Sequence, residues 1–312
     1  MILYTVVPCY NEEEMLPETV EVLSEKYRAL MESNKISEES KVLFVDDGSF
    51  DKTWEMIEQY HKEKPIFCGI KLSRNRGHQN ALFAGLITAS EYCDAAVSID
   101  ADLQDDVNAI DEMIDKFSEG TEIVYGVRNK RATDSFMKRF TAEGYYKIMK
   151  FFGADIMFNH ADFRLMSKRA IEFLGEFEEV NLFLRGMVPL VGLKSDIVYY
   201  ERLERTAGES KYTLKKMLEL GWNGITSFST RPIEMILGAG IGISTLSAFA
   251  MLVMLIIFLC GIQIAAAWWL AAVIVLCCGI NLCAVGVVGE YVAKAYLETK
   301  HRPKYFIEKK EI

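Results

Sequence analysis

The sequence predicts an α/β domain built on a mainly parallel sheet, followed by a pair of membrane-spanning helices. Short apolar runs rich in β-forming residues alternate with helical segments as far as Val127, which is the pattern of successive strand–helix–strand units. Three of these runs end in polar clusters, and a long stretch without charged residues lies near the C-terminus. The alternation predicts the sheet, and the uncharged stretch predicts the helix pair.

The alternating segments have short links, so each strand is expected to lie parallel to its neighbours. The expected strands are Ile2–Val7, Lys41–Asp46, Ile66–Leu72, Ala95–Ile99 and Ile123–Val127. The helices between them are expected from Asn11 to about Met31, from Thr53 to about His61, up to Ser90, and from Val107 to Glu119. Asn11 with Glu14 three residues later resembles a capping box, which predicts a helix start there. A further short strand is expected at Asp162–Ser167, led by a carboxylate.

The C-terminal stretch from Met235 to Gly289 has 55 consecutive residues without Asp, Glu, Lys, Arg or His. A spanning helix needs about 20 apolar residues, so two are expected, at roughly 233–259 and 265–291. Basic residues flank the pair and are absent from its turn, which places both ends in the cytoplasm. We therefore expect a multi-pass protein of the cytoplasmic (inner) membrane, with the domain at 1–232 and a basic tail at 292–312 in the cytoplasm. A buried helical hairpin in a soluble protein is the alternative.

Two amphipathic segments precede the apolar stretch. Residues 134–152 carry aromatic bulk on one side and basic residues on the other, and a similar segment lies near 212–230. This composition is typical of helices that lie in the membrane interface. A core-facing helix fits the first segment as well, so both interpretations stay open there.

Composition excludes some partners. The formal net charge is −9 and no basic block is present, so no nucleic-acid partner is expected. The seven cysteines form no Cys-x-x-Cys pair, which indicates free thiols in a reducing compartment. The first residues lack the basic flank of a signal peptide.

The polar clusters at three strand ends predict a binding site. They are Tyr10-Asn-Glu12, Asp46-Asp-Gly-Ser49 and Asp100-Ala-Asp102. In open parallel sheets, ligands bind beyond the carboxyl ends of the strands. The glycine-rich turn of dinucleotide-binding domains is missing after the first strand, so side chains and a metal would have to hold a nucleotide.

The third cluster predicts the metal. Asp100, Asp102 and the nearby Gln104 present oxygen ligands at the end of a rigid strand. This arrangement suits Mg²⁺ or Mn²⁺, with a bound diphosphate completing the shell. A solvated acidic loop that caps the next helix, with Asp105 or Asp106 as N-cap, is the alternative.

Cationic residues supply candidate phosphate contacts. Arg128 and Arg131 flank the end of the fifth strand and Ser135 follows, which suits a phosphate at the membrane surface. The loop Arg205–Tyr212 contains Gly208 and Lys211, and such a loop can close over a diphosphate. A plain surface loop fits this segment as well.

Five motifs in this order resemble the polyprenyl-phosphate glycosyltransferases, family 2 enzymes of the GT-A fold similar to dolichyl-phosphate mannose synthase and bacterial undecaprenyl-phosphate glucosyltransferases. The motifs are Val7-Pro-Cys-Tyr-Asn-Glu12, Val45-Asp-Asp-Gly-Ser49, Asp100-Ala-Asp-Leu-Gln104, Asp162-Phe-Arg-Leu-Met166 and Gly208-Glu-Ser-Lys-Tyr212. Each motif is common, but the ordered set with a C-terminal helix pair is specific. The resemblance runs from about residue 2 to Arg302-Pro303.

The resemblance implies inverting transfer of a sugar from a nucleotide diphosphate sugar to a membrane polyprenyl phosphate for cell-envelope glycosylation. The default substrates are UDP-glucose and undecaprenyl phosphate. It implies a nucleotide-sugar site at Pro8, Tyr10, Glu12, Asp47, Asp100, Ala101, Arg205 and Lys211, with the metal at Asp102, Gln104 and Asp100. It also implies that Arg128, Arg131 and Ser135 bind the lipid phosphate, and that Asp162 and Asp102 are catalytic.

Several points stay open at the level of the sequence. Asp162 either accepts a proton or orients the acceptor, because a phosphate monoester with a second pKa near ~6 needs little deprotonation. A processive polysaccharide synthase and a non-catalytic membrane adaptor that binds a nucleotide sugar are the competing functions. Self-association into a homo-oligomer is a further expectation for the helix pair.

Overall fold

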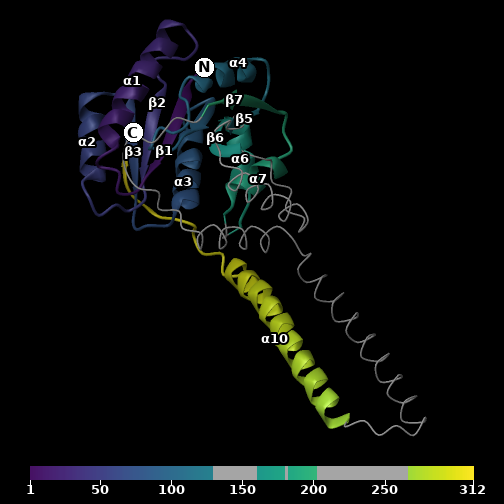
Figure 1. Ribbon diagram of the computed structural model, residues 1–312. Helices are drawn as coiled ribbons and strands as arrows, with labels where there is room; N and C mark the ends of the chain where they lie inside the picture. Colours follow the sequence, from purple (N-terminus) through teal and green to yellow (C-terminus); the bar gives the residue numbers. More distant parts are fainter. Residues whose placement is uncertain (129–159, 180–181, 202–265) are drawn as a thin grey trace. The chain divides into compact units, whose positions relative to one another are not determined.

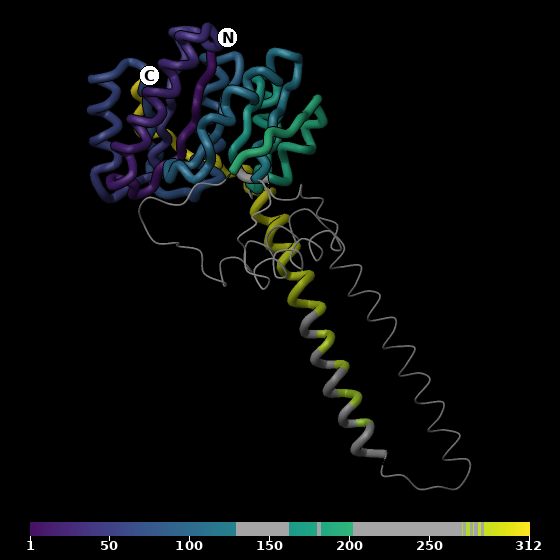
Figure 2. The backbone as a smooth tube through the Cα atoms, turned by 45° about the horizontal axis from the view of Figure 1, so that its top comes forward, coloured from purple at the N-terminus to yellow at the C-terminus, as the bar shows by residue number. Residues whose placement is uncertain are grey.

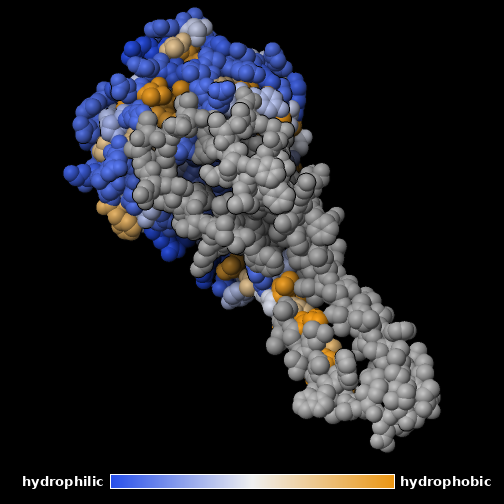
Figure 3. Space-filling view, viewed as in Figure 1, coloured by the Kyte–Doolittle hydropathy of each residue, from blue (hydrophilic) through white to orange (hydrophobic). Residues whose placement is uncertain are grey.

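The computed structural model describes residues 1–128, 160–179, 182–201 and 266–312. These residues fall into two compact units, which are considered separately. The first unit contains the sheet, its helices and the C-terminal residues from His301, and the second contains a single described helix. On the face shown in Figure 3, the described surface of the first unit is largely hydrophilic.

The first unit is built on an eight-stranded sheet in the order β7-β5-β6-β4-β1-β2-β3-β8 (Figure 1). Its strands are β1 (Leu3–Cys9), β2 (Lys41–Asp46), β3 (Phe67–Leu72), β4 (Ala95–Ser98), β5 (Ile123–Arg128), β6 (His160–Ser167), β7 (Ser195–Tyr200) and β8 (Ile307–Glu311). Pairs β1–β2, β1–β4, β2–β3 and β5–β7 are parallel, whereas β6 and β8 run antiparallel to their neighbours. The predicted α/β fold with a mainly parallel sheet is therefore confirmed.

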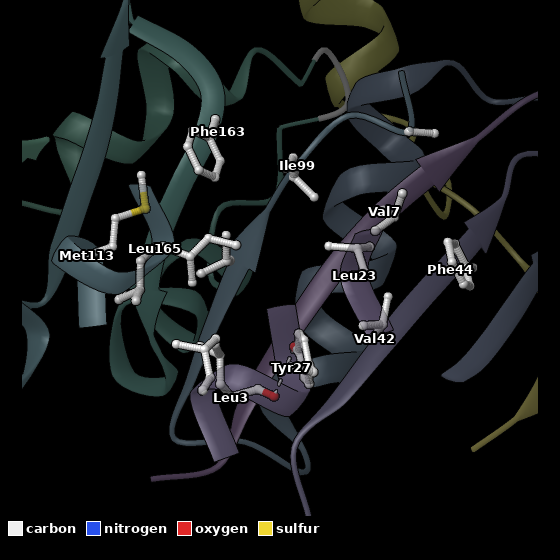
Figure 4. Close-up of a cluster of buried hydrophobic side chains, with 14 of the residues drawn as sticks. Leu3, Val7, Leu23, Tyr27, Val42, Phe44, Ile99, Met113, Phe163 and Leu165 are labelled. Carbon is white, nitrogen blue, oxygen red and sulfur yellow. Dashed lines mark hydrogen bonds between the residues drawn. The ribbon is translucent and has the colours of Figure 1, made fainter. Parts of the chain in front are cut away.

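Helices connect the strands and cover the sheet. They are α1 (Leu16–Glu32), α2 (Thr53–Glu63), α3 (His78–Ser90), α4 (Ala109–Ser118), α6 (Lys168–Gly175) and α7 (Leu184–Leu190). Residues of α1, α2 and α4 share one buried cluster with β1 and β2. Figure 4 shows Leu23 and Tyr27 of α1 against Val42 and Phe44 of β2.

The opposite face of the sheet carries α3. A side chain at Gly85 of this helix would lie 2.3 Å from Cγ1 of Val6 and 2.6 Å from Cγ2 of Val45. Val6 alternates with Val7, which belongs to the cluster on the other face. Glycine at position 85 therefore lets α3 approach β1 and β2 closely, which fixes the position of the residues at its N-terminus.

The C-terminal residues form an edge strand that the sequence does not predict. β8 pairs antiparallel with β3, with Gly69 opposite Glu311 and Leu72 opposite Ile307. Figure 2 shows this yellow segment beside strands from the first part of the chain. Charged side chains suit a solvated edge strand because they discourage further pairing. Lys309 and Lys310 bind Glu58 and Glu91 at 2.9 and 3.1 Å.

The predicted helix start at Asn11 is wrong, because α1 begins at Leu16. Asn11 adopts a φ of +54°, outside the range of a helix cap. Its Oδ1 accepts the backbone N–H of Phe50 at 2.9 Å. The asparagine therefore joins two loops instead of capping a helix.

Native Cys68 and Cys93 are expected to resist alkylation. Burial, as the largest cause, raises the pKa of each thiol to about 12. Only the thiolate reacts, so about one thiol in 10⁴ is reactive at pH 8. Mass spectrometry after iodoacetamide treatment should show both residues unlabelled in native protein and labelled in urea. Equal labelling in both conditions would contradict this burial.

The second unit is represented by α10 (Ala266–Glu298), a helix of 33 residues. Among the described residues, no helix combines the length with the apolar window that membrane crossing requires. This finding contradicts the expected multi-pass location in the inner membrane, and the described residues give no support to the transmembrane hairpin of the fold prediction. The other predicted span, 233–259, lies outside the described residues.

Candidate active site

The carboxyl ends of the central strands bring the predicted polar clusters to one edge of the sheet. In the register of the sheet, Cys9 of β1 lies opposite Asp46 of β2, and Val6 of β1 lies opposite Ser98 of β4. The backbone N–H of Asp47 donates to the carbonyl of Cys9 at 2.9 Å. Tyr10, Asp47 and Asp100 therefore follow three adjacent parallel strands at the same edge, as the sequence predicts.

Hydrogen bonds join the loops that follow β1 and β2. The backbone N–H of Asn11 donates to Oγ of Ser49 at 3.0 Å, and that of Glu12 donates to Oγ1 of Thr53 at 2.9 Å. These bonds place the half-buried Tyr10 edge-on to Phe50, with ring centroids 6.5 Å apart. Phe50 is 88 % exposed. Pro8 is buried at the end of β1, so the joined loops form a fixed wall with two accessible aromatic rings.

Asp47 is buried and holds the loop that leads into α3. Its Oδ1 accepts the backbone N–H of Arg76 at 2.7 Å, and its Oδ2 accepts that of Gly77 at 2.9 Å. Burial raises the pKa of this carboxyl, and the two backbone N–H groups oppose that rise. Asp47 thus fixes the segment immediately before His78, in addition to its predicted nucleotide contact.

Gly48 lets the same loop pack against the turn after β2. It has a φ of +68°, and a Cβ there would lie 2.6 Å from the backbone carbon of Arg74. We expect Gly48→Ala to move this loop and to weaken nucleotide binding, measured by calorimetric titration with UDP. The left-handed conformation alone costs about 1–2 kcal/mol of stability.

Gly120→Ala is the matched control for that prediction. Gly120 has a φ of +85°, but a Cβ there meets nothing within 4 Å. Both variants therefore carry the conformational cost, and only Gly48→Ala displaces the loop. Equal UDP affinity in the two variants would contradict the role given to the contact.

The acidic residues after β4 fit a divalent cation only in part. Asp100, Asp102 and Gln104 are half-buried, and Oδ1 of Asp102 accepts the backbone N–H of Gln104 at 3.3 Å. Burial, as the largest cause, raises the pKa of Asp100; His78 opposes this rise, and the neighbouring carboxylates add to it. No group of three or more His, Cys, Asp or Glu among the described residues is placed to hold a metal. Two carboxylates and an amide suit Mg²⁺ when a diphosphate supplies the remaining oxygens.

Ala101 belongs to the framework of this loop. It is buried, and its carbonyl accepts the hydroxyl of Thr19 in α1 at 2.8 Å. The bond anchors the acidic loop to the first helix between the two carboxylates.

Asp162 lies at the centre of a buried ionic network. Its carboxylate accepts Nη2 of Arg164 at 2.7 Å and a two-point contact from Arg185, with Nε at 3.2 Å and Nη2 at 3.0 Å. Nε2 of Gln79 donates to it at 3.3 Å, and Nε2 of His78 lies 3.7 Å away. The residue is 7 % exposed.

This network determines the protonation of Asp162. Burial alone would raise its pKa, but Arg185, His78 and Arg164 outweigh burial and hold the pKa well below its usual value. A carboxylate with such a low pKa is a weak proton acceptor. The geometry therefore favours an orienting or charge-stabilising role for Asp162 over that of a base.

His78 links this network to the acidic loop. Its Nε2 lies 3.5 Å from Oδ1 of Asp100. Partial burial lowers the pKa of His78, but Asp100 and Asp162 outweigh it and raise the pKa to about 9. At neutral pH the ring is therefore a cation between two carboxylates.

Arg128 ends β5, at the same edge of the sheet. Its guanidinium contacts Asp105 at 2.9 Å and the hydroxyl of Tyr200 at 3.1 Å. The other predicted phosphate ligands, Arg131, Ser135, Arg205 and Lys211, lie outside the described residues, as do the segments 134–152 and 212–230. The structure thus places one of the five predicted cationic or hydroxyl ligands.

The sequence analysis does not identify the partners of Asp162. His78, Gln79 and Arg185 come from segments 23 to 84 positions away, which local patterns do not connect. Arg164 is the one partner of Asp162 that the local sequence could have indicated. An arginine in an otherwise apolar strand requires a buried partner, and Asp162 lies two positions earlier on the same face.

Comparison with known proteins gives consistent matches. Residues 4–175 match the sequence model of a family described as Glycosyl transferase family 2. The chain is 48% identical to the glycosyltransferase YkoT of Bacillus subtilis strain 168, over 98% of this chain and 91% of that protein. It is 37% identical to the bactoprenol glucosyl transferase of Shigella phage SfV, over 98% of both chains. It is also 37% identical to the prophage bactoprenol glucosyl transferase homolog of Escherichia coli K12, over 99% of both chains.

Proposed function

The chain belongs to glycosyltransferase family 2, and from this premise we propose that it transfers glucose from a nucleotide diphosphate sugar to a polyprenyl phosphate. The expected donor is UDP-glucose and the expected acceptor is undecaprenyl phosphate. Near full-length similarity to proteins named bactoprenol glucosyl transferase supports the sugar and the acceptor class. One observation carries the proposal. The acidic loop, the joined loops after β1 and β2, and the Asp162 network all lie at the same edge of the sheet.

The donor would lie along the carboxyl ends of β1, β2 and β4. Tyr10 and Glu12 would face the nucleoside, with Pro8, Asp47 and Ala101 shaping the wall behind it. Asp100, Asp102 and Gln104 would hold Mg²⁺ or Mn²⁺, which neutralises charge on the departing diphosphate. Arg205 and Lys211 would contact the same diphosphate from their loop.

The chemistry is a single displacement at the anomeric carbon. An oxygen of the acceptor phosphate forms the new bond, the bond from the anomeric carbon to the diphosphate oxygen breaks, and the nucleoside diphosphate leaves. The acceptor is largely a dianion at neutral pH, because its second pKa is near ~6. The reaction therefore needs no strong base, which agrees with the ionised, arginine-bound state of Asp162. Asp162 would stabilise positive charge that develops on the sugar.

The acceptor phosphate would be held in line by Arg128, Arg131 and Ser135. Guanidinium groups contact phosphate oxygens in pairs, so they fix both distance and orientation. Such positioning converts two separate substrates into a reactive pair.

A transfer assay tests the proposal. Purified full-length protein is incubated with detergent-dispersed undecaprenyl phosphate, Mg²⁺ or Mn²⁺, and radiolabelled UDP- or GDP-sugars. We expect label to enter the organic phase with UDP-glucose and to stay in the aqueous phase when EDTA is present. Nucleotide binding without transfer from any donor would instead identify a non-catalytic nucleotide-sugar-binding protein. Transfer that EDTA does not affect would refute the metal assignment.

A further inference from the structure

Two buried groups hold the side chain of Arg128. Asp105, in the loop after β4, is 2 % exposed, and its Oδ1 accepts Nη2 of Arg128 at 2.9 Å and Nε at 3.3 Å. Tyr200, the last residue of β7, donates its hydroxyl to the same Oδ1 at 2.5 Å. The hydroxyl also accepts Nε of Arg128 at 3.1 Å. The three side chains therefore form a closed triangle of hydrogen bonds.

The backbone builds this triangle from fixed elements. Arg128 and Tyr200 are register partners at the ends of the parallel strands β5 and β7. The Tyr200 ring packs edge-on against Phe163 of β6, with centroids 5.2 Å apart. Asp105 is placed by the loop that also carries the acidic residues of the proposed metal site. Two members of the triangle therefore come from strands, and the third comes from the loop after β4.

The burial of the triangle is asymmetric. The carboxylate is fully enclosed, whereas the Arg128 side chain is 29 % exposed. Both contacts use the Nε–Nη2 edge of the guanidinium. No partner for Nη1 is found among the described residues. The partly exposed guanidinium therefore keeps its other edge, which carries Nη1, available for a further contact.

We propose that Asp105 and Tyr200 are positioning residues that fix the Arg128 guanidinium so that its outer edge receives the phosphate of the acceptor. The inference rests on the proposed function, since that function supplies the phosphate. Because the guanidinium is planar and rigid, binding along one edge also fixes the orientation of the opposite edge. The Tyr200 hydroxyl bonds to both Asp105 and Arg128. Removal of this hydroxyl should therefore let the guanidinium rotate, although no charge is lost.

The test compares two neighbouring tyrosines. Tyr200→Phe removes the hydroxyl and keeps the ring against Phe163. Tyr199→Phe is the matched control, because Tyr199 is the adjacent residue of β7 and is exposed. Michaelis constants are measured separately for undecaprenyl phosphate and for the nucleotide sugar, together with the melting temperature.

We expect Tyr200→Phe to raise the KM for the acceptor about tenfold, since a hydrogen bond to a charged group is lost. The KM for the donor should match that of Tyr199→Phe, whereas the melting temperature should fall by a few degrees because the buried Asp105 carboxylate loses a donor. Asp105→Asn should change the acceptor KM in the same direction. An unchanged acceptor KM in Tyr200→Phe, or equal changes in both Michaelis constants, overturns the inference.

A double variant tests whether Tyr200 acts through Arg128. Arg128→Lys keeps the positive charge but replaces the planar guanidinium, which can bind along two edges, by a single ammonium group. If Tyr200 acts by orienting the guanidinium, Tyr200→Phe should add little to the loss in Arg128→Lys. Fully additive losses would show that the two residues act independently and would contradict the inference.

Direct binding separates failure of the inference from failure of the proposed function. Calorimetric titration with a short-chain polyprenyl phosphate needs no turnover. Unchanged protein that binds this lipid without transferring sugar refutes the proposed function, and weaker binding by Tyr200→Phe then still supports the inference. Equal binding by Tyr200→Phe and Tyr199→Phe refutes the inference alone. Absence of binding by the unchanged protein refutes both.

Discussion

Replacement of Asp162 by alanine is expected to destabilise the protein by about 3–5 kcal/mol and to abolish glycosyl transfer. The stability loss follows from Arg164, which is 1 % exposed and has Asp162 as its carboxylate partner at 2.7 Å. Removing one member of a buried ion pair leaves an uncompensated charge in the interior. Nε of Arg164 already lacks a hydrogen-bond partner among the described residues. The network therefore has no spare acceptor that could replace Asp162. Urea denaturation of the full-length protein measures the change.

A paired replacement separates this structural effect from the catalytic one. In Asp162→Leu/Arg164→Met both buried charges are gone, and such replacements of an ion pair by apolar residues are often neutral for stability. Arg185 and His78 remain partly exposed, so solvent can compensate their charges. We expect stability close to that of the unchanged protein and no transfer. Transfer by the paired variant would contradict a role for Asp162 in the reaction.

Asp102→Asn is expected to lower transfer by at least about 10³-fold while leaving the fold intact. The carboxylate would contribute charge to the proposed metal site, and an amide oxygen is a weaker ligand for Mg²⁺. The backbone contact survives, because Oδ1 of asparagine can still accept the N–H of Gln104. Loss of stabilisation of the departing diphosphate therefore dominates the effect. Transfer and thermal unfolding are measured on the same preparation.

Asp106→Asn is the matched control for that variant. Asp106 is also half-buried, and its Oδ1 accepts the backbone N–H of Asn108 two positions later, at 2.9 Å. The two aspartates thus make the same local contact, and only Asp102 is assigned to the metal. Similar activity in the two variants would remove Asp102 from the metal site.

The central strands were predictable because they are buried on both faces. β1, β2 and β3 are mainly apolar runs followed by polar residues, and their observed bounds lie close to those expected. β7 and β8 were not predicted. β8 has the composition Ile-Glu-Lys-Lys-Glu, which resembles a solvated tail, and its strand conformation comes from the free edge of β3.

The expected membrane location is the prediction that the structure contradicts. A charge-free run in the sequence measures composition, whereas a membrane span also requires a continuous helix with an apolar window of sufficient length. Among the described residues, no helix meets this requirement.

The sequence by itself determined the family, the parallel sheet and the edge at which polar residues gather, because strand ends and motifs are local properties of the chain. Only the tertiary structure decided the electrostatics of that edge. Antiparallel pairing of β6 with β4 places Asp162 near Asp100, and α3 and α7 then supply His78 and Arg185. A pKa depends on charges within a few ångströms, whatever their separation in the chain. For that reason the ionised state of Asp162 and the fixed orientation of Arg128 follow from packing.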